Sequence, residues 1–238
     1  MLTRRSLLVA APAIVLARPS LAQVGQIATW PPKGFISGGG GGTTTFDPST
    51  IDAGITLSGG NLITSTTANG YQHTRSIANH STGKYYWEIN IAPTYNGLGQ
   101  CAIGIGDSAN LHYQTVGGST YPGIDAHTAA LFDNGTTLYI NNAATACLAA
   151  HFFAGDYVGI ALDAGAQLIW IRDHAGGVAS NWNNSGTANP ATGVGGISIA
   201  AITGPYYAYA WMGNTSSFTA NFGGSAFAMT APSGFGNL

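Results

Sequence analysis

Alternation of apolar and polar positions predicts β-strands along most of the chain, and no stretch of useful length has a helical period. The clearest strand covers residues 84–91, in which every second residue is large and apolar. Side chains on a strand point to opposite faces in turn. We therefore expect Trp87 to point into a core, and Tyr86 and Glu88 to lie on the opposite face.

Short strands with turns between them recur along the rest of the chain. Residues 55–58 and 62–65 flank Gly59-Gly60-Asn61, a sequence typical of a β-hairpin turn. Many short strands at near-regular spacing predict an all-β sandwich. The further strands that we predict are 100–106, 130–132, 138–140, 197–202, 206–211 and 218–222.

Two apolar strands around a short turn occupy the centre of the chain, at 155–177. The first alternates like a half-buried strand, whereas the second is apolar at neighbouring positions as well. We expect one residue in two on each strand to enter the core between the sheets. The predicted core consists of Trp87, Val158, Ile160, Leu162, Leu168 and Trp170, with Ile169 and Ile171 on the other face.

The composition of the chain limits the kinds of partner that it can bind. Charged residues make up only 7% of the chain, which contains 35 glycines and is 45% hydrophobic. An apolar content this high argues against a disordered chain. Nucleic-acid binding requires clusters of Lys and Arg, which the sequence lacks. Beyond residue 22, four basic side chains face nine acidic ones, a net charge of −5.

The N-terminus has the features of an export signal. Residues 1–22 contain Arg4-Arg5, an apolar run and a small-residue end at Ala22, which predicts a signal peptide cut after that residue. The paired arginines resemble a twin-arginine signal. The apolar run is shorter than the ~20 residues that span a bilayer, so we expect no stable membrane insertion after cleavage. The prediction is a periplasmic or secreted protein, with a Pro- and Gly-rich linker at 23–42 and one domain at 43–238.

Four sequence blocks follow one another along the mature chain: 81–89 (STGKYYWEI), 103–105 (IGI), 153–163 (FAGDYVGIALD) and 221–235, which begins with Asn221-Phe222-Gly223. These ordered blocks resemble the SPRY (B30.2) domain family, in a bacterial or phage-type form. The first two look like two of its strands, the third resembles its central signature, and the fourth resembles its C-terminal "NFGxxPF…PxGF" ending. The resemblance implies a SPRY-type sandwich of two antiparallel sheets, in the concanavalin-like jelly-roll class, with a structural Glu at position 88 and no catalytic residues. Long polar loops are expected at 141–146 and 181–196.

The resemblance also implies a binding site, because family members bind peptide or protein surfaces with loops at one edge. Residues 210–213 (AWMG) resemble the family's "xVWG" segment with one inserted residue, and Tyr113 lies in a stretch similar to its "GYxTxVG" segment. The implied ligand-binding residues are Trp211, Tyr113, Met212 and Gly213. We expect Trp211 and Tyr113 to line one largely uncharged pocket. Packing at the edge of the sandwich is the alternative role for both.

Other chemistries have weaker support in the sequence. Gly106-Asp107-Ser108 resembles a hydrolase nucleophile motif, but a turn explains it better because no matching His and Asp segments follow. Glu88 is the single Glu, so a glycosidase pair of carboxylates has little support, and the six His lack zinc-ligand spacing. We predict no enzyme activity, metal or cofactor. A lectin-like glycan-binding sandwich and a structural surface or phage-tail component are the alternatives, and a disulfide between Cys101 and Cys147 is left open.

Overall fold

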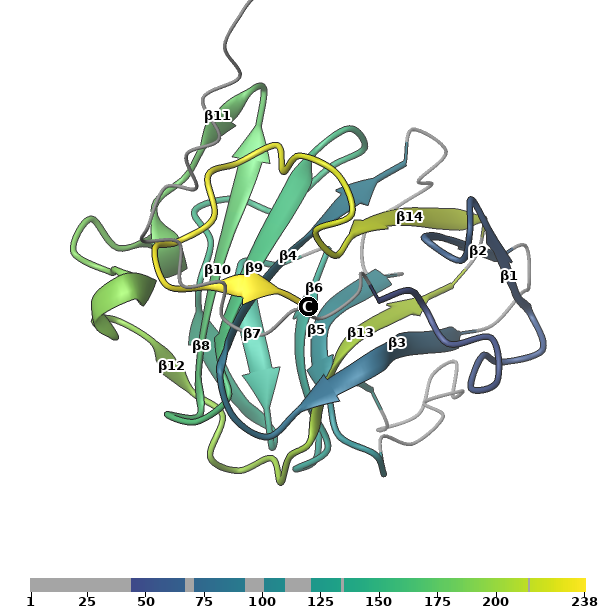
Figure 1. The fold of residues 1–238 in the computed structure, drawn as a ribbon, viewed down its shortest axis with the longest axis horizontal. Coiled ribbons are helices and arrows are strands. Elements are labelled where there is room, and N and C mark those ends of the chain that lie inside the picture. The colour runs from purple at the N-terminus through teal and green to yellow at the C-terminus, as the bar shows by residue number, and fades with distance from the viewer. Residues whose placement is uncertain (1–43, 67–70, 93–100, 110–120, 134, 214) are drawn as a thin grey trace, which may run out of the picture. The chain divides into compact units, whose positions relative to one another are not determined.

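Two packed β-sheets form the fold (Figure 1), in a computed structural model that describes residues 44–66, 71–92, 101–109, 121–133, 135–213 and 215–238. The predicted all-β sandwich is confirmed. The helical segments within these ranges are two single 3-10 turns, Trp182–Asn184 and Pro190–Thr192. No helix in the described ranges is both long and apolar enough to cross a membrane.

The larger sheet has nine strands, paired antiparallel except for the short C-terminal strand β15 (Gly236–Asn237), which runs parallel to β4 (Lys84–Ile91). The predicted first hairpin is present, and its turn residues Gly59, Gly60 and Asn61 have φ values of 58°, 69° and 64°. The order along the sheet is β1 (Ile55–Ser58), β2 (Ile63–Thr66), β14 (Ser216–Asn221), β4 (Lys84–Ile91), β9 (Tyr157–Asp163), β10 (Leu168–Ala175) and β11 (Val178–Ala179), with β12 (Ile197–Ser198) beside β10 and β15 (Gly236–Asn237) beside β4.

The smaller sheet has six antiparallel strands. Its last strand corrects one prediction, because part of the expected loop at 141–146 forms β8 (Ala143–Ala146). This strand pairs with β7 (Thr137–Ile140) through a turn at Asn141-Asn142. The small side chains of this segment give little strand signal in the sequence. The order is β3 (Gln72–His80), β13 (Tyr206–Met212), β5 (Cys101–Gly106), β6 (Thr128–Phe132), β7 (Thr137–Ile140) and β8 (Ala143–Ala146).

The core lies between the two sheets and is built from alternate residues of their facing strands. Four predicted members, Trp87, Val158, Ile160 and Leu162, are fully buried in it. Tyr86 and Glu88 lie on the opposite face of β4, as the alternation predicts. The polar residues that alternate along this strand therefore identify its inner face correctly.

The prediction for β10 is wrong in its choice of face. Ile169 and Ile171 enter the core between the sheets, whereas Trp170 is buried on the outer face and Leu168 is partly buried beside it. The Trp170 indole N–H donates to the Val194 carbonyl at 2.9 Å, so the 181–196 segment covers this face. Both faces of β10 are apolar because both are covered. The outer layer includes Tyr86, Ala161, Trp170, Trp182, Phe227 and Phe235.

Both cysteines are free and buried. The open question of a disulfide is therefore settled in favour of two thiols. Burial raises the pKa of Cys101 to about 11 and that of Cys147 to about 12, because a thiolate is poorly solvated in an apolar interior. Cys101 lies in β5 and belongs to the core between the sheets, as does Cys147.

Candidate binding surface

The outer face of the smaller sheet combines small residues with large rings. Antiparallel pairing aligns residues of neighbouring strands, so that their side chains share one face. Ala102, Ala130 and Gly104 lie in the middle, and a Cβ atom at Gly104 would overlap the Ala129 carbonyl oxygen. Two rows result from this pairing: His73, Trp211, Ala102 and Phe132; and Arg75, Tyr209, Gly104, Ala130 and Tyr139.

Five rings lie together on this face, and we call them the aromatic cluster: Tyr71, Tyr121, Phe132, Tyr139 and Trp211. Tyr71 stacks on Trp211, with ring centroids 4.1 Å apart and planes at 12°. Phe132 meets Trp211 edge-on at 5.7 Å and also meets Tyr121 and Tyr139 edge-on at 6.1 Å and 5.8 Å. Both arrangements are favourable for aromatic pairs and hold the rings in fixed positions.

The rings of the aromatic cluster differ in how far they are exposed to solvent. Trp211 is only 4% exposed, whereas the other four rings are half-buried. None of the five side chains carries a formal charge. The accessible part is therefore a set of half-exposed rings that rest on a buried tryptophan, and it offers stacking faces and phenol hydroxyls to a ligand.

The predicted site residues that the structure describes do not share one surface. Trp211 is in the aromatic cluster, but Met212 is fully buried in the core between the sheets, because adjacent strand residues point to opposite faces. The Met212 side chain therefore cannot share a surface with Trp211. Gly213 is buried at the end of β13, where its carbonyl accepts a hydrogen bond from the Ser216 hydroxyl at 2.6 Å. Tyr113 lies outside the described residues, so its pairing with Trp211 stays a prediction.

Sequence reasoning did not identify the other rings of the aromatic cluster. Tyr71 precedes β3, Tyr121 lies in the segment before β6, and Tyr139 is in β7, so the fold of the smaller sheet is what brings these rings together. One signal was available for Phe132 and Tyr139, since both occupy positions that alternate with core residues across a predicted hairpin. That alternation marks them as outward-facing rings.

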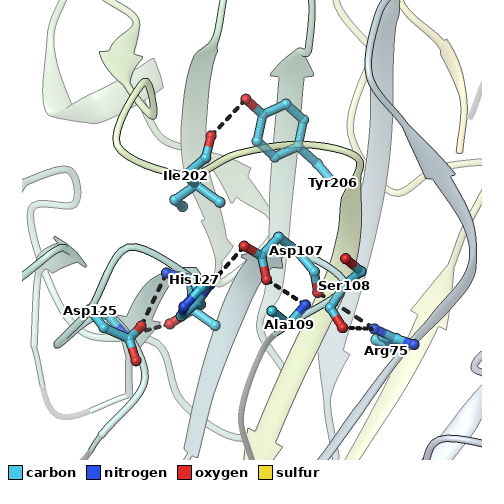
Figure 2. A network of polar contacts seen from close by, with 10 residues as sticks. Arg75, Asp107, Ser108, Ala109, Asp125, His127, Ile202 and Tyr206 are labelled. Carbon is cyan, nitrogen blue, oxygen red and sulfur yellow. Dashed lines mark hydrogen bonds and ion pairs between the residues drawn. The ribbon is translucent and has the colours of Figure 1, made fainter.

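A polar network follows β5, at the end of the strand away from Trp211 (Figure 2). The Asp107 carboxylate is 2.8 Å from Nδ1 of His127 and also accepts the Ala109 backbone N–H at 2.8 Å. The bond to Ala109 is an Asx turn, the local bond that Asp makes in turns. Asp107 is therefore engaged in holding this segment, in keeping with the turn interpretation of Gly106-Asp107-Ser108.

Electrostatics in this network favour a charged histidine. The hydrogen bond to Asp107 raises the pKa of His127 above 6.5, with burial opposing the shift and the charges of Asp107 and Asp125 adding to it. Arg75 approaches the Ser108 carbonyl at 3.4 Å, and its guanidinium lies 4.3 Å from the centroid of the Tyr207 ring. The network ties β3 to the segments that follow β5 and precede β6.

Metal binding finds no support in the described ranges, where no group of three or more His, Cys, Asp or Glu residues is placed to hold an ion. Two buried acids beside β9 instead accept hydrogen bonds from backbone N–H groups. The Asp156 carboxylate accepts the Phe153 N–H at 2.7 Å, and Asp163 accepts that of Ala166 at 2.9 Å. These two acids cap turns beside β9, as their positions in the sequence indicate.

Comparison with known proteins identifies the fold. No protein-family model and no curated protein sequence matches the chain. The SPRY domain of human HERC1 matches 76% of this chain and 99% of its own chain, with a TM-score of 0.55 and 14% identity. The TRIM65 PSpry domain matches 75% of this chain and 89% of its own, also at 0.55 and 14%. Stonustoxin matches 75% of this chain over 27% of its own length, with a TM-score of 0.51 and 14% identity. The chain therefore has the fold of a SPRY domain, a sandwich of two antiparallel sheets.

Proposed function

We propose that this protein is an exported, non-enzymatic binding module that recognises a peptide or protein surface through the aromatic cluster. The observation that carries the proposal is the set of half-buried, uncharged rings fixed on the buried Trp211. Rings that are held in place before binding lose little conformational freedom when a ligand arrives. Aromatic side chains also supply much of the binding energy at protein interfaces.

The resemblance to the SPRY family supports this function. Members of that family bind peptide or protein surfaces, and the present fold is theirs. The segment that resembles the family's pocket motif contributes Trp211 to the aromatic cluster. The bound segment would contact Tyr71 and Tyr139 by stacking and by hydrogen bonds to the phenol hydroxyls, so that binding depends little on salt.

Export is the second part of the proposal. The signal-like residues 1–22 motivate it, and a cut after Ala22 gives a mature protein that begins at Gln23. N-terminal sequencing of the periplasmic or secreted fraction tests it directly. A first residue of Gln23 supports export, and an uncleaved Met1 in the cytosolic or membrane fraction contradicts it.

Parallel peptide and glycan arrays test the binding function. We expect reproducible peptide signals with the unmodified protein, lost in the Tyr71→Ala variant. Phe153→Ala is the matched control, because Phe153 is 49% exposed and lies outside the aromatic cluster. Sugar rings also stack on aromatic faces, so signals confined to glycans and lost in Tyr71→Ala would replace the peptide function with the glycan-binding alternative. Peptide signals that Tyr71→Ala leaves intact would contradict the proposed surface.

A further inference from the structure

A groove opens on the outer face of the larger sheet, away from the aromatic cluster. Its volume is about 370 Å³, near the lower end of the ~300–1,000 Å³ typical of small-molecule sites. Strands β14, β4 and β9 form the floor, and residues 225–228 of the C-terminal segment form a wall. The yellow C-terminal segment crosses this sheet in Figure 1. A groove of this size suits a small ligand or a single end group.

The floor carries a row of polar side chains across three strands. Strand register aligns Thr219 with Asn90, and Asn90 with Tyr157. With neighbouring strands about 4.8 Å apart, the row extends over roughly 10 Å. Asn221 and Glu88 form the next row towards the wall. The groove therefore presents closely spaced polar groups along one line.

The wall is fixed to the floor at both ends. The Asn221 amide donates to the carbonyls of Ser225 and Ala226 at 3.3 Å and 3.0 Å. The Glu88 carboxylate accepts the backbone N–H groups of Ala228 and Met229 at 2.7 Å and 2.8 Å. Because these contacts are internal to the chain, the groove is formed before any ligand arrives.

The floor of the groove keeps polar groups that can hydrogen-bond to a ligand, and most of their open positions are acceptors. The Asn90 amide nitrogen is used, since it donates to the Asp156 carbonyl at 3.2 Å, which leaves the amide oxygen facing away from that bond. Three groups that line the groove make no hydrogen bond within the described part of the chain. They are the Thr219 hydroxyl, the Tyr157 hydroxyl and the Asn90 amide oxygen. A hydroxyl both donates and accepts, whereas an amide oxygen only accepts. A ligand rich in hydroxyl groups matches this set.

The charged residues that line the groove restrict the charge of a possible ligand. No Lys, Arg or His lines the groove, and Glu88 is its one acidic residue, so nothing there attracts an anion. The Glu88 carboxylate already accepts three hydrogen bonds, including one from the Tyr86 hydroxyl at 2.7 Å. Glu88 is also only 1% exposed, so its charge is satisfied within the chain and is nearly inaccessible from the groove. A neutral ligand therefore matches the groove best.

We propose that this groove binds a neutral pyranose unit, with its hydroxyls on the row Thr219, Asn90 and Tyr157. The wall supplies an apolar surface for the C–H face of the sugar, from the half-buried Phe227, which is held edge-on against Tyr86 at 4.8 Å. The site is on the opposite sheet from the aromatic cluster and uses none of its residues. Its existence is therefore independent of the proposed peptide-binding function.

Saturation-transfer NMR with the methyl glycosides of glucose, galactose, mannose and N-acetylglucosamine tests the site. We expect at least one of them to bind, and glucuronate to bind more weakly because of its charge. Thr219→Val and Tyr157→Phe each remove a single hydroxyl and should weaken binding by about fivefold, the effect of losing one neutral hydrogen bond. Thr56→Val and Tyr85→Phe are the matched controls, since both hydroxyls lie outside the groove.

Three results would overturn the proposal. One is the absence of saturation transfer to all four glycosides with a protein whose thermal midpoint shows that it is folded. Another is binding that Thr219→Val and Tyr157→Phe leave unchanged. The third is competition by methylammonium at the concentration of the glycoside, which would make the groove a cation site centred on Glu88. Loss of peptide binding in Tyr71→Ala leaves each of these outcomes unaffected, so the two proposals fail separately.

Discussion

Replacing Glu88 with glutamine should destabilise the fold by about 2–4 kcal/mol. Glu88 is 1% exposed, and its two carboxylate oxygens accept hydrogen bonds from Tyr86, Ala228 and Met229. An amide has only one accepting oxygen. In the glutamine variant this oxygen would take the place of Glu88 Oε1, which accepts from the Tyr86 hydroxyl and the Met229 N–H. The glutamine NH2 group would then face the Ala228 N–H. Leaving this partly buried donor without a partner costs about 1–3 kcal/mol, and exchanging a charged acceptor for a neutral one at the other two bonds costs roughly 1 kcal/mol more.

Urea unfolding of the purified protein measures this loss. With a slope of about 2 kcal/mol/M, within the usual range for such domains, the midpoint should fall by about 1–2 M. Asp47→Asn is the control, because the Asp47 carboxylate accepts its hydrogen bonds from Ser49 in an exposed turn. We expect that substitution to cost less than about 1 kcal/mol. Equal midpoints for Glu88→Gln and Asp47→Asn would refute the claim that the buried carboxylate fixes the C-terminal segment.

Three further predictions follow from the packing and the charges. Gly104→Ala should destabilise the fold by about 1–3 kcal/mol or more in urea unfolding, because its Cβ meets the backbone of β6, whereas Gly186→Ala meets open space and should be neutral. NMR titration should place the His127 pKa above 6.5 and show it fall when Asp107 is replaced by Asn. The contribution of the His127–Asp107 pair to the free energy of unfolding is complete below about pH 6.5 and is lost as the pH rises through the raised pKa of His127. A free energy of unfolding that rises with pH in this window would contradict this contribution. The two cysteines should react with a thiol reagent at pH 8 only after unfolding, since burial raises their pKa values to about 11 and 12.

The sequence predicts inner and outer faces only where polarity alternates. In β4, polar Glu88 and Asn90 alternate with apolar residues, so the position of Trp87 in the core could be read from the pattern. In β10, Ile169 and Trp170 are both apolar, because one faces the core and the other is covered by the 181–196 segment. A strand that is buried on both faces carries no period that identifies its inner side.

The candidate site is less visible in the sequence than the fold. Resemblance to a family segment pointed to Trp211, but the packing that buries Trp211 comes from Tyr71 and Phe132, which belong to other parts of the chain. The same segment suggested Met212, which strand alternation places in the core. Contacts between distant strands depend on sheet order and register, and neither can be read from a short motif.

The affinity of an array-selected peptide for the Tyr71→Ala variant tests the central claim most directly. Calorimetric titration should show binding at least tenfold weaker than that of the unmodified protein, a loss of about 1.4 kcal/mol, with Phe153→Ala unchanged. The unmodified protein should retain most of its affinity between about 0.1 M and 1 M salt, over which the Debye length falls from ~10 Å to ~3 Å. Equal affinities for Tyr71→Ala and the unmodified protein, or affinity that falls steeply with salt, would contradict recognition by the aromatic cluster.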